Sequence, residues 1–149
     1  MIQIGVIGAS KCDERLYHIA MKIGELLAER GCVVVNGGLG GVMEASAKGA
    51  KMKGGITVGI LPSDSKEFAN PYIDIAIVTN MGHARNMIIA HTCDALIAVG
   101  GEYGTISEMA IALKIGKKVV AIEPMVVLPG VKVVNTPEEA VKEALRDLI

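Results

Sequence analysis

Hydrophobic and polar positions divide the chain into two alternating kinds of segment. Short apolar runs, which suit buried strands, alternate with stretches in which apolar residues recur at helical spacing. The expected strands cover 2–7, 32–35, 57–61, 73–78, 95–99 and 118–122, with a further extended piece near 131–134. Helices are expected from near Leu16 to a cap at Gly31, over 42–50, 83–92 and 105–115, and from 136 onward. This alternation predicts an α/β, Rossmann-like three-layer fold, with helices on both faces of a mainly parallel sheet of about six to seven strands.

The whole chain, residues 1–149, is expected to form one domain of this kind. A length of 149 residues with 51% hydrophobic side chains suffices for one buried core. The polar stretch 63–72 contains Pro71 and is interpreted as a surface loop rather than a linker. We find no internal repeat and no low-complexity segment.

Charge and cysteine content narrow the classes of partner. The 15 basic and 16 acidic residues are spread along the chain, so nucleic acid is an unexpected partner. Cys12, Cys32 and Cys93 lie far apart, which favours neither a disulfide framework nor a zinc site and fits a reducing compartment. The first residues lack the pattern of a signal peptide and no apolar run approaches a membrane span. We expect a cytoplasmic protein with no membrane, metal or resident cofactor.

Half of the 18 glycines lie at three expected strand-to-helix junctions. The junctions are the segments after the first, second and fifth strands, and their candidate ligand-binding residues are Gly8, Ser10, Gly37, Gly38, Gly40, Gly41, Met43, Gly100, Gly101, Glu102, Tyr103, Gly104 and Thr105. Exposed backbone amides at helix N-termini bind phosphate well. Tight turns also need glycine whatever they bind, and Ser10 is equally suited to cap the first helix.

Two nucleotide-binding signatures are absent. Gly5 and Gly8 do not complete Gly-x-Gly-x-x-Gly, and the second strand ends in Asn36 rather than an acidic residue for a ribose hydroxyl. No P-loop sequence occurs either. Ordinary dinucleotide binding and P-loop hydrolysis are therefore disfavoured.

Arg85 and Glu108 are the candidate catalytic residues. Each falls in the first part of a helix that follows a strand, and we expect both to face the same crevice. Arginine binds phosphate or ribose hydroxyls, and a carboxylate stabilises positive charge at a glycosidic carbon. The alternatives are a solvated helix arginine and a capping box in which Glu108 reaches back to the Thr105 amide.

The motifs around these residues resemble those of a known family. The run from Arg85-Asn86 to Gly100-Gly101-Glu102-Tyr103-Gly104-Thr105-Ile106-Ser107-Glu108, together with Gly37-Gly38-Leu39-Gly40-Gly41-Val42-Met43-Glu44, resembles the Lonely guy phosphoribohydrolases, once mislabelled as lysine decarboxylases. Their superfamily, known as SLOG, includes molybdenum-cofactor carrier proteins. The resemblance covers about residues 1–122, and the Gly-Val-Met-Glu form is closer to the uncharacterised and carrier branches.

The resemblance implies a Rossmann-like fold, usually dimeric, that cleaves nucleoside 5′-monophosphates into a free base and ribose 5-phosphate. Arg85 and Glu108 then take the catalytic positions, and 101–105 take the phosphate loop. Asn86, which we count among the candidate binding residues, replaces the family's lysine, while Glu44 and Glu102 replace glycines. Relative to the family, one cation is removed and two carboxylates are added around the expected phosphate site, so the identity of the substrate is left open.

Three functions remain open from the sequence: a hydrolase, a binding or carrier protein for a nucleotide or the molybdenum cofactor, and a scaffold with a vestigial crevice. Each of the first two implies a small phosphorylated ligand. The helices that contain Arg85 and 105–115 carry more Met, Ile and Ala than one buried face needs, and we expect a homodimer or higher homo-oligomer to form through them.

Overall fold

The computed structural model describes residues 1–148 and confirms the α/β fold. Its seven strands are β1 (Gln3–Gly8), β2 (Val33–Asn36), β3 (Thr57–Leu61), β4 (Ile75–Val78), β5 (Ala95–Val99), β6 (Lys118–Ile122) and β7 (Lys132–Val133). Its helices are α1 (Glu14–Glu29), α2 (Val42–Met52), α3 (Arg85–Thr92), α4 (Tyr103–Lys114) and α5 (Pro137–Leu145). Short 3₁₀ turns, η1 (Lys66–Phe68) and η2 (Gly82–Ala84), precede β4 and α3.

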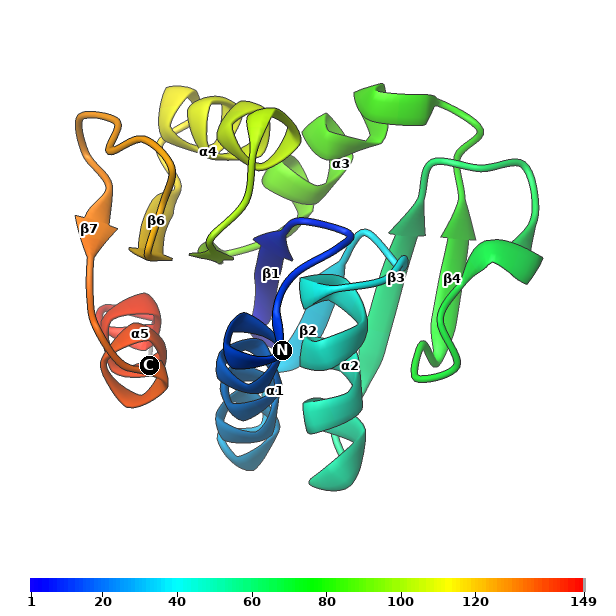
Figure 1. Ribbon diagram of the computed structural model, residues 1–149, viewed down its shortest axis with the longest axis horizontal. Coiled ribbons are helices and arrows are strands. Elements are labelled where there is room, and N and C mark those ends of the chain that lie inside the picture. Colours follow the sequence, from blue (N-terminus) through cyan, green and yellow to red (C-terminus); the bar gives the residue numbers. More distant parts are fainter. Residues whose placement is uncertain (149) are drawn as a thin grey trace.

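The strands form one sheet in the order β4-β3-β2-β1-β5-β6-β7, and every pair is parallel (Figure 1). All five residues of β5 are buried, as expected for a central parallel strand that helices cover on both faces. The chain direction across the sheet reverses between β1 and β5. Ligands bind parallel sheets beyond the carboxyl ends of strands at such a reversal.

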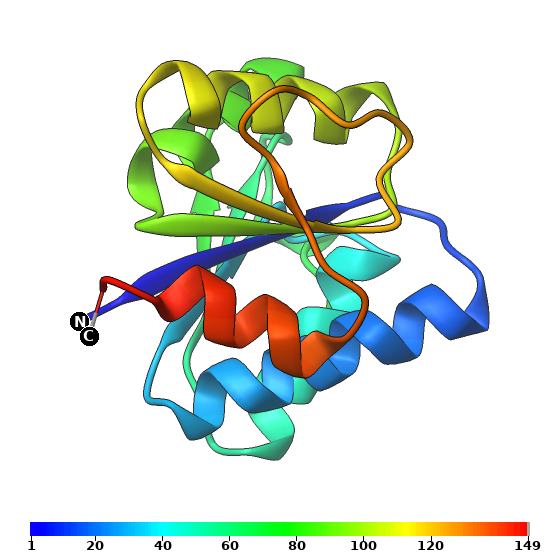
Figure 2. The same cartoon turned by 90° about the vertical axis from the view of Figure 1, so that its left-hand side faces the viewer.

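The three layers are visible edge-on in Figure 2, with α3 and α4 on one face and α1, α2 and α5 on the other. Alternate residues along each strand enter different halves of the core. Ile4 and Ile97 pack toward α1, while Leu96 and Ala98 pack toward α3 and α4. No helix within residues 1–148 has the length and apolar character needed to cross a bilayer.

Helices α1 and α2 approach each other at two glycines. A Cβ atom on Gly49 would lie 1.9 Å from the carbonyl oxygen of Met21, and one on Gly24 would lie 2.0 Å from that of Ser46. These distances are far below a van der Waals contact. Glycine is therefore required here by helix packing, away from any ligand.

Helix α4 begins earlier than the sequence predicts. It starts at Tyr103, and Glu102 occupies the N-cap without a side-chain hydrogen bond. Thr105 therefore lies inside the first turn.

Helix α1 ends close to the predicted position. Arg30 is its C-cap, and Gly31 follows with φ +76°, the left-handed conformation that favours glycine.

Candidate functional site

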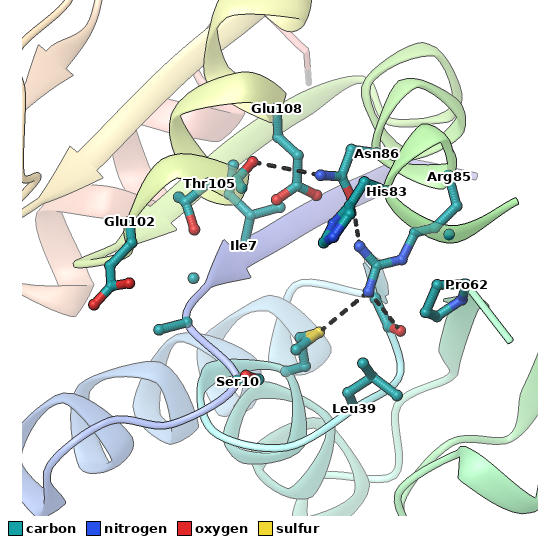
Figure 3. A pocket seen from close by; sticks show the side chains of 16 residues that line it. Ile7, Ser10, Leu39, Pro62, His83, Arg85, Asn86, Glu102, Thr105 and Glu108 are labelled. Atoms are coloured by element: carbon teal, nitrogen blue, oxygen red, sulfur yellow. Dashed lines mark hydrogen bonds between the residues drawn. The ribbon is translucent and has the colours of Figure 1, made fainter.

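A pocket of about 500 Å³ opens at the carboxyl ends of β1, β2, β3 and β5 (Figure 3). Five chain segments form its walls: the end of β1 with its loop, the loop after β2 with the start of α2, Pro62 after β3, η2 with the first turn of α3, and the first turns of α4. Its volume lies in the range of small-molecule sites. The pocket therefore occupies the place that the parallel sheet makes available for a ligand.

Asn36 organises the loop after β2 and was not predicted to do so. Its buried side-chain amide donates to the Met43 carbonyl at 2.9 Å and to Ser46 Oγ at 3.1 Å, and its Oδ1 accepts from the Gly38 amide at 2.8 Å. One amide thus joins the strand end, the glycine loop and α2. An amide side chain directly before a glycine run was the available signal.

Arg85 is 8% exposed, so the interpretation as a solvated helix arginine is wrong. Its Nε donates to the Ile60 carbonyl at 2.8 Å, its Nη2 to the Gly37 carbonyl at 3.3 Å, and its Nη1 to Asn86 Oδ1. Burial lowers the pKa of Arg85, while the nearby Glu108 opposes that change. The guanidinium is fixed by protein acceptors at the pocket wall.

Glu108 is 6% exposed, and within residues 1–148 its carboxyl group accepts no hydrogen bond. The capping-box interpretation is therefore wrong, because Thr105 lies inside α4 rather than at its N-cap. Every fully buried side-chain nitrogen or oxygen in the same residues has a partner, so the Glu108 carboxyl must open onto the pocket. Desolvation raises its pKa to about 8, although Arg85 acts in the opposite direction.

Two predicted glycines are required by the side chains of the site. A Cβ on Gly37 would lie 2.4 Å from Arg85 Nη2 and 2.6 Å from Met43 Sδ. Gly101 has φ +98°, and a Cβ there would meet Thr105 Oγ1 at 2.4 Å. At Gly37 glycine leaves room for neighbouring side chains, a need that turn geometry alone does not create, whereas at Gly101 the left-handed backbone and the close approach of Thr105 both favour it.

The pocket collects ten of the predicted site residues: Gly8, Ser10, Gly37, Met43, Arg85, Asn86, Glu102, Gly104, Thr105 and Glu108. The other six, Gly38, Gly40, Gly41, Gly100, Gly101 and Tyr103, do not line it. Tyr103 is instead 78% exposed. Ser10 does not cap α1 either, because Asp13 is the N-cap and accepts from the Leu16 amide.

Six lining residues were not among the predicted binding residues: Ile7, Ala9, Leu39, Pro62, Gly82 and His83. Most are apolar or small and lie at or just beyond strand ends, so the only sequence feature that could have indicated them is their position after a predicted strand. His83 is the one aromatic side chain on the described pocket wall. A bound ring would therefore pack mainly on Leu39, Pro62 and Ile7.

Glu44, one of the two added carboxylates, lies outside the pocket. Its Oε2 accepts a hydrogen bond of 2.8 Å from Tyr17 Oη, between α2 and α1. Glu102 does line the pocket, whereas no lysine of the described chain does. Within residues 1–148, no group of three or more His, Cys, Asp or Glu side chains is arranged to hold a metal ion.

The family model described as the SLOG cluster4 family matches residues 1–147, and the chain belongs to that family. An uncharacterized protein of Archaeoglobus fulgidus is 64% identical over 95% of this chain and 93% of its own. The cytokinin riboside 5′-monophosphate phosphoribohydrolase of Mycobacterium tuberculosis is 35% identical over 68% of this chain. This chain spans only 56% of that enzyme's length.

Solved structures with the same fold include molybdenum-cofactor proteins. The molybdenum cofactor binding protein of Rippkaea orientalis is 34% identical, with a TM-score of 0.94, over 99% of this chain and 98% of that one. The molybdenum cofactor carrier protein of Chlamydomonas reinhardtii is also 34% identical, with a TM-score of 0.85 over the same shares. The relatives thus include both enzymes and carriers.

Proposed function

We propose that this chain binds a nucleoside 5′-monophosphate and hydrolyses its N-glycosidic bond, which yields a free base and ribose 5-phosphate. One observation carries the proposal: Arg85 and Glu108, both buried, face one pocket whose walls also hold backbone amides after β1 and at the start of α4. The similarity to a phosphoribohydrolase over 68% of the chain supports it.

The reaction needs charge stabilisation at two ends of the substrate. Water adds to C1′ while the C1′–N bond breaks, the bonding electrons go to the base nitrogen, and the base takes up a proton that the water releases. Positive charge develops at the ribose carbon, and an adjacent carboxylate stabilises it. We assign that role to Glu108. Arg85 and the amides at the start of α4 hold the phosphate.

Incubation of the purified protein with a panel of nucleoside 5′-monophosphates, with released base measured by chromatography, tests the proposal. We expect at least one substrate to be cleaved and the Glu108→Gln variant to lose activity by about 100-fold or more. Glu44→Gln is the matched control, because Glu44 bonds Tyr17 outside the pocket. No base from any substrate would refute hydrolysis.

The pH profile tests the assigned charge of Glu108. With a pKa of about 8 in the ligand-free protein, the carboxylate form becomes predominant only above that pH. We expect kcat/KM to rise with pH and to level off above about 8. A profile that falls over the same range would assign Glu108 to proton donation instead.

A binding protein for a nucleotide or for the molybdenum cofactor is the second candidate. The similarity to the Rippkaea orientalis protein over 99% of this chain favours it, as does the lack of a lysine on the described pocket wall. A carrier would gain thermal stability from the ligand without releasing product. Mass spectrometry of molecules that co-purify with the undenatured protein identifies that ligand directly.

The predicted homodimer remains part of the proposal. Met87 on α3 is 52% exposed and, with Met81 and Ile88, lines an apolar hollow. We expect sedimentation to show a dimer at micromolar concentration and Met87→Glu to dissociate it. A monomeric wild-type protein would remove the dimer without affecting the proposed chemistry.

A further inference from the structure

The guanidinium of Arg85 and the carboxyl group of Glu108 lie in the same buried wall, and yet they form no ion pair with each other in the described structure. The two side chains are close enough to interact electrostatically: Glu108 raises the pKa of Arg85, and Arg85 lowers the pKa of Glu108, although burial acts more strongly on both. Once Glu108 is ionised, contact with the guanidinium would offset the cost of an unpaired buried charge. The hydrogen bonds of the guanidinium show what holds it away from the carboxyl group.

Asn86 accepts one of these hydrogen bonds. Its side chain is 4% exposed, and both ends of its amide are engaged in different parts of the site. Oδ1 accepts from Arg85 Nη1, while Nδ2 donates to Ser107 Oγ at 3.3 Å and lies 3.5 Å from the Gly104 carbonyl. The amide orientation is thus fixed by a donor on α3 and by acceptors in the first turns of α4.

The positions agree with this role. Figure 3 shows the Asn86 amide beside the Glu108 side chain and joined by a hydrogen bond to the Arg85 guanidinium, with the His83 ring in front of the space between the two groups. With Nη1 held by Asn86, Nε held by Ile60 and Nη2 held by Gly37, the guanidinium has no freedom to turn toward α4. Ser107 is itself anchored, because its hydroxyl donates to the Gly104 carbonyl at 2.6 Å.

We propose that Asn86 is a positioning residue that holds the Arg85 guanidinium away from Glu108 and so leaves both side chains free for a ligand between them. The proposal rests on the proposed function only in that it treats Arg85 and Glu108 as ligand-facing groups. At the position of the family's lysine, this chain thus has an amide that sets geometry instead of a second cation.

The acidity of Glu108 in the ligand-free protein reports this geometry. The other ionisable groups around it are Arg85 from α3, His83 from η2, Glu102 at the start of α4 and the buried thiol of Cys93. An opposite charge that closes to within ion-pair distance lowers a carboxyl pKa by about one to three pH units. Release of Arg85 must therefore lower the pKa of Glu108.

The experiment is a titration of the Glu108 side-chain carboxyl carbon by NMR, assigned with the Glu108→Gln variant. In Asn86→Leu, which nearly keeps the side-chain shape but loses both hydrogen bonds, we expect the pKa of Glu108 to fall by about one pH unit or more. Asn86→Ala replaces it if the leucine variant does not fold. Glu44→Gln is the matched control, because Glu44 bonds Tyr17 outside the pocket and the change should leave the pKa of Glu108 unchanged, whereas Ser107→Ala removes one acceptor of the Asn86 amide and should lower that pKa less than Asn86→Leu does.

A double variant distinguishes positioning of the Arg85 guanidinium from a general loosening of the packing around Glu108. When Arg85→Met is already present, Asn86→Leu has no guanidinium to release and should leave the pKa of Glu108 unchanged. An equal fall in that background, or no fall in the single variant, would overturn the inference. The titration needs neither ligand nor turnover. If the pKa responds as expected but no nucleotide is cleaved, the proposed hydrolysis fails and the role of Asn86 stands.

Discussion

The α1–α2 crossing and the pocket wall both depend on glycine, but for opposite reasons. At the crossing, Gly49 removes a side chain so that backbone can pack against backbone. At the pocket, Gly37 removes one so that a guanidinium can lie beside the loop. The crossing satisfies its groups within the protein, whereas the pocket leaves the buried carboxyl of Glu108 without a hydrogen-bond donor among residues 1–148. One region is organised for stability, and the other keeps groups available at a cost in stability.

The largest effect should come from the crossing. In Gly49→Ala the new methyl would meet the Met21 carbonyl oxygen at 1.9 Å, and neither backbone can move aside cheaply. Overpacking of this kind outweighs the roughly 1 kcal/mol that alanine gains over glycine in a helix, so we expect a loss of about 3 kcal/mol. Urea unfolding measures it. Met52→Ala on the exposed part of the same helix should change little, and an equally mild result for Gly49→Ala would break the comparison.

In the pocket, Glu108→Gln should raise the free energy of unfolding at high pH, whereas Gly49→Ala at the crossing lowers it. Because the pKa of Glu108 is raised from 4.5 to about 8 in the folded protein, the folded state holds a proton that the unfolded state has lost between these values. Stability should therefore fall as the pH rises from about 4.5 to about 8, by on the order of a few kcal/mol, and stay low above it.

The glutamine variant lacks this titration, so it should be more stable than the wild type at pH 9 and nearly equal to it at pH 4. Thermal unfolding across the range measures the difference. Glu44→Gln should show no such gain, since that carboxylate is already hydrogen-bonded by Tyr17. Parallel stability curves for the wild type and Glu108→Gln would contradict the raised pKa of Glu108.

A smaller loss of stability but a clear loss of binding is expected for Gly37→Ala. The methyl would meet the Arg85 guanidinium at 2.4 Å and disturb its hydrogen bonds, but it meets side chains rather than backbone, so stability should fall by about 2 kcal/mol, less than at Gly49. Affinity for the nucleoside 5′-monophosphate that the substrate panel identifies, measured by calorimetry, should fall by about tenfold or more as Arg85 moves. Gly49→Ala, assayed below its melting temperature, should bind as the wild type does.

The smallest effects distinguish the two added carboxylates. Glu102→Gln removes a negative charge from the pocket wall and should raise the affinity for the same nucleotide a few-fold, more at low salt than at high salt. Glu44→Gln should leave that affinity unchanged, because Glu44 lies between α1 and α2. Equal responses would mean that the two regions are electrostatically coupled.

The order of strands and helices was predictable because strands buried on both faces form continuous apolar runs. The convergence of Arg85 and Glu108 on one pocket was also predictable, since both follow carboxyl ends of parallel strands. Of the sixteen candidate site residues named from the glycine-rich junctions and the family resemblance, ten line the pocket and six do not. These features follow from short-range pattern and parallel connectivity.

The remaining errors came from contacts between distant segments. The burial of Arg85 depends on the Ile60 carbonyl, far away in the chain, and nothing local to Arg85 indicates it. Helix α4 starts at Tyr103, although Thr105 and Glu108 have the spacing of a capping box at a helix N-terminus. Spacing in the sequence alone cannot show which of two nearby residues is the N-cap.

The hydrogen bonds of Asn36 lower the entropic cost of binding at the glycine loop after β2. They fix this loop within the fold itself, through the Gly38 amide and the Met43 carbonyl. A loop that must become ordered on binding loses roughly 1 to 2 kcal/mol of conformational entropy per residue. Here that ordering belongs to folding, so the glycine-rich wall is already rigid, and the proposed ligand would not have to order it.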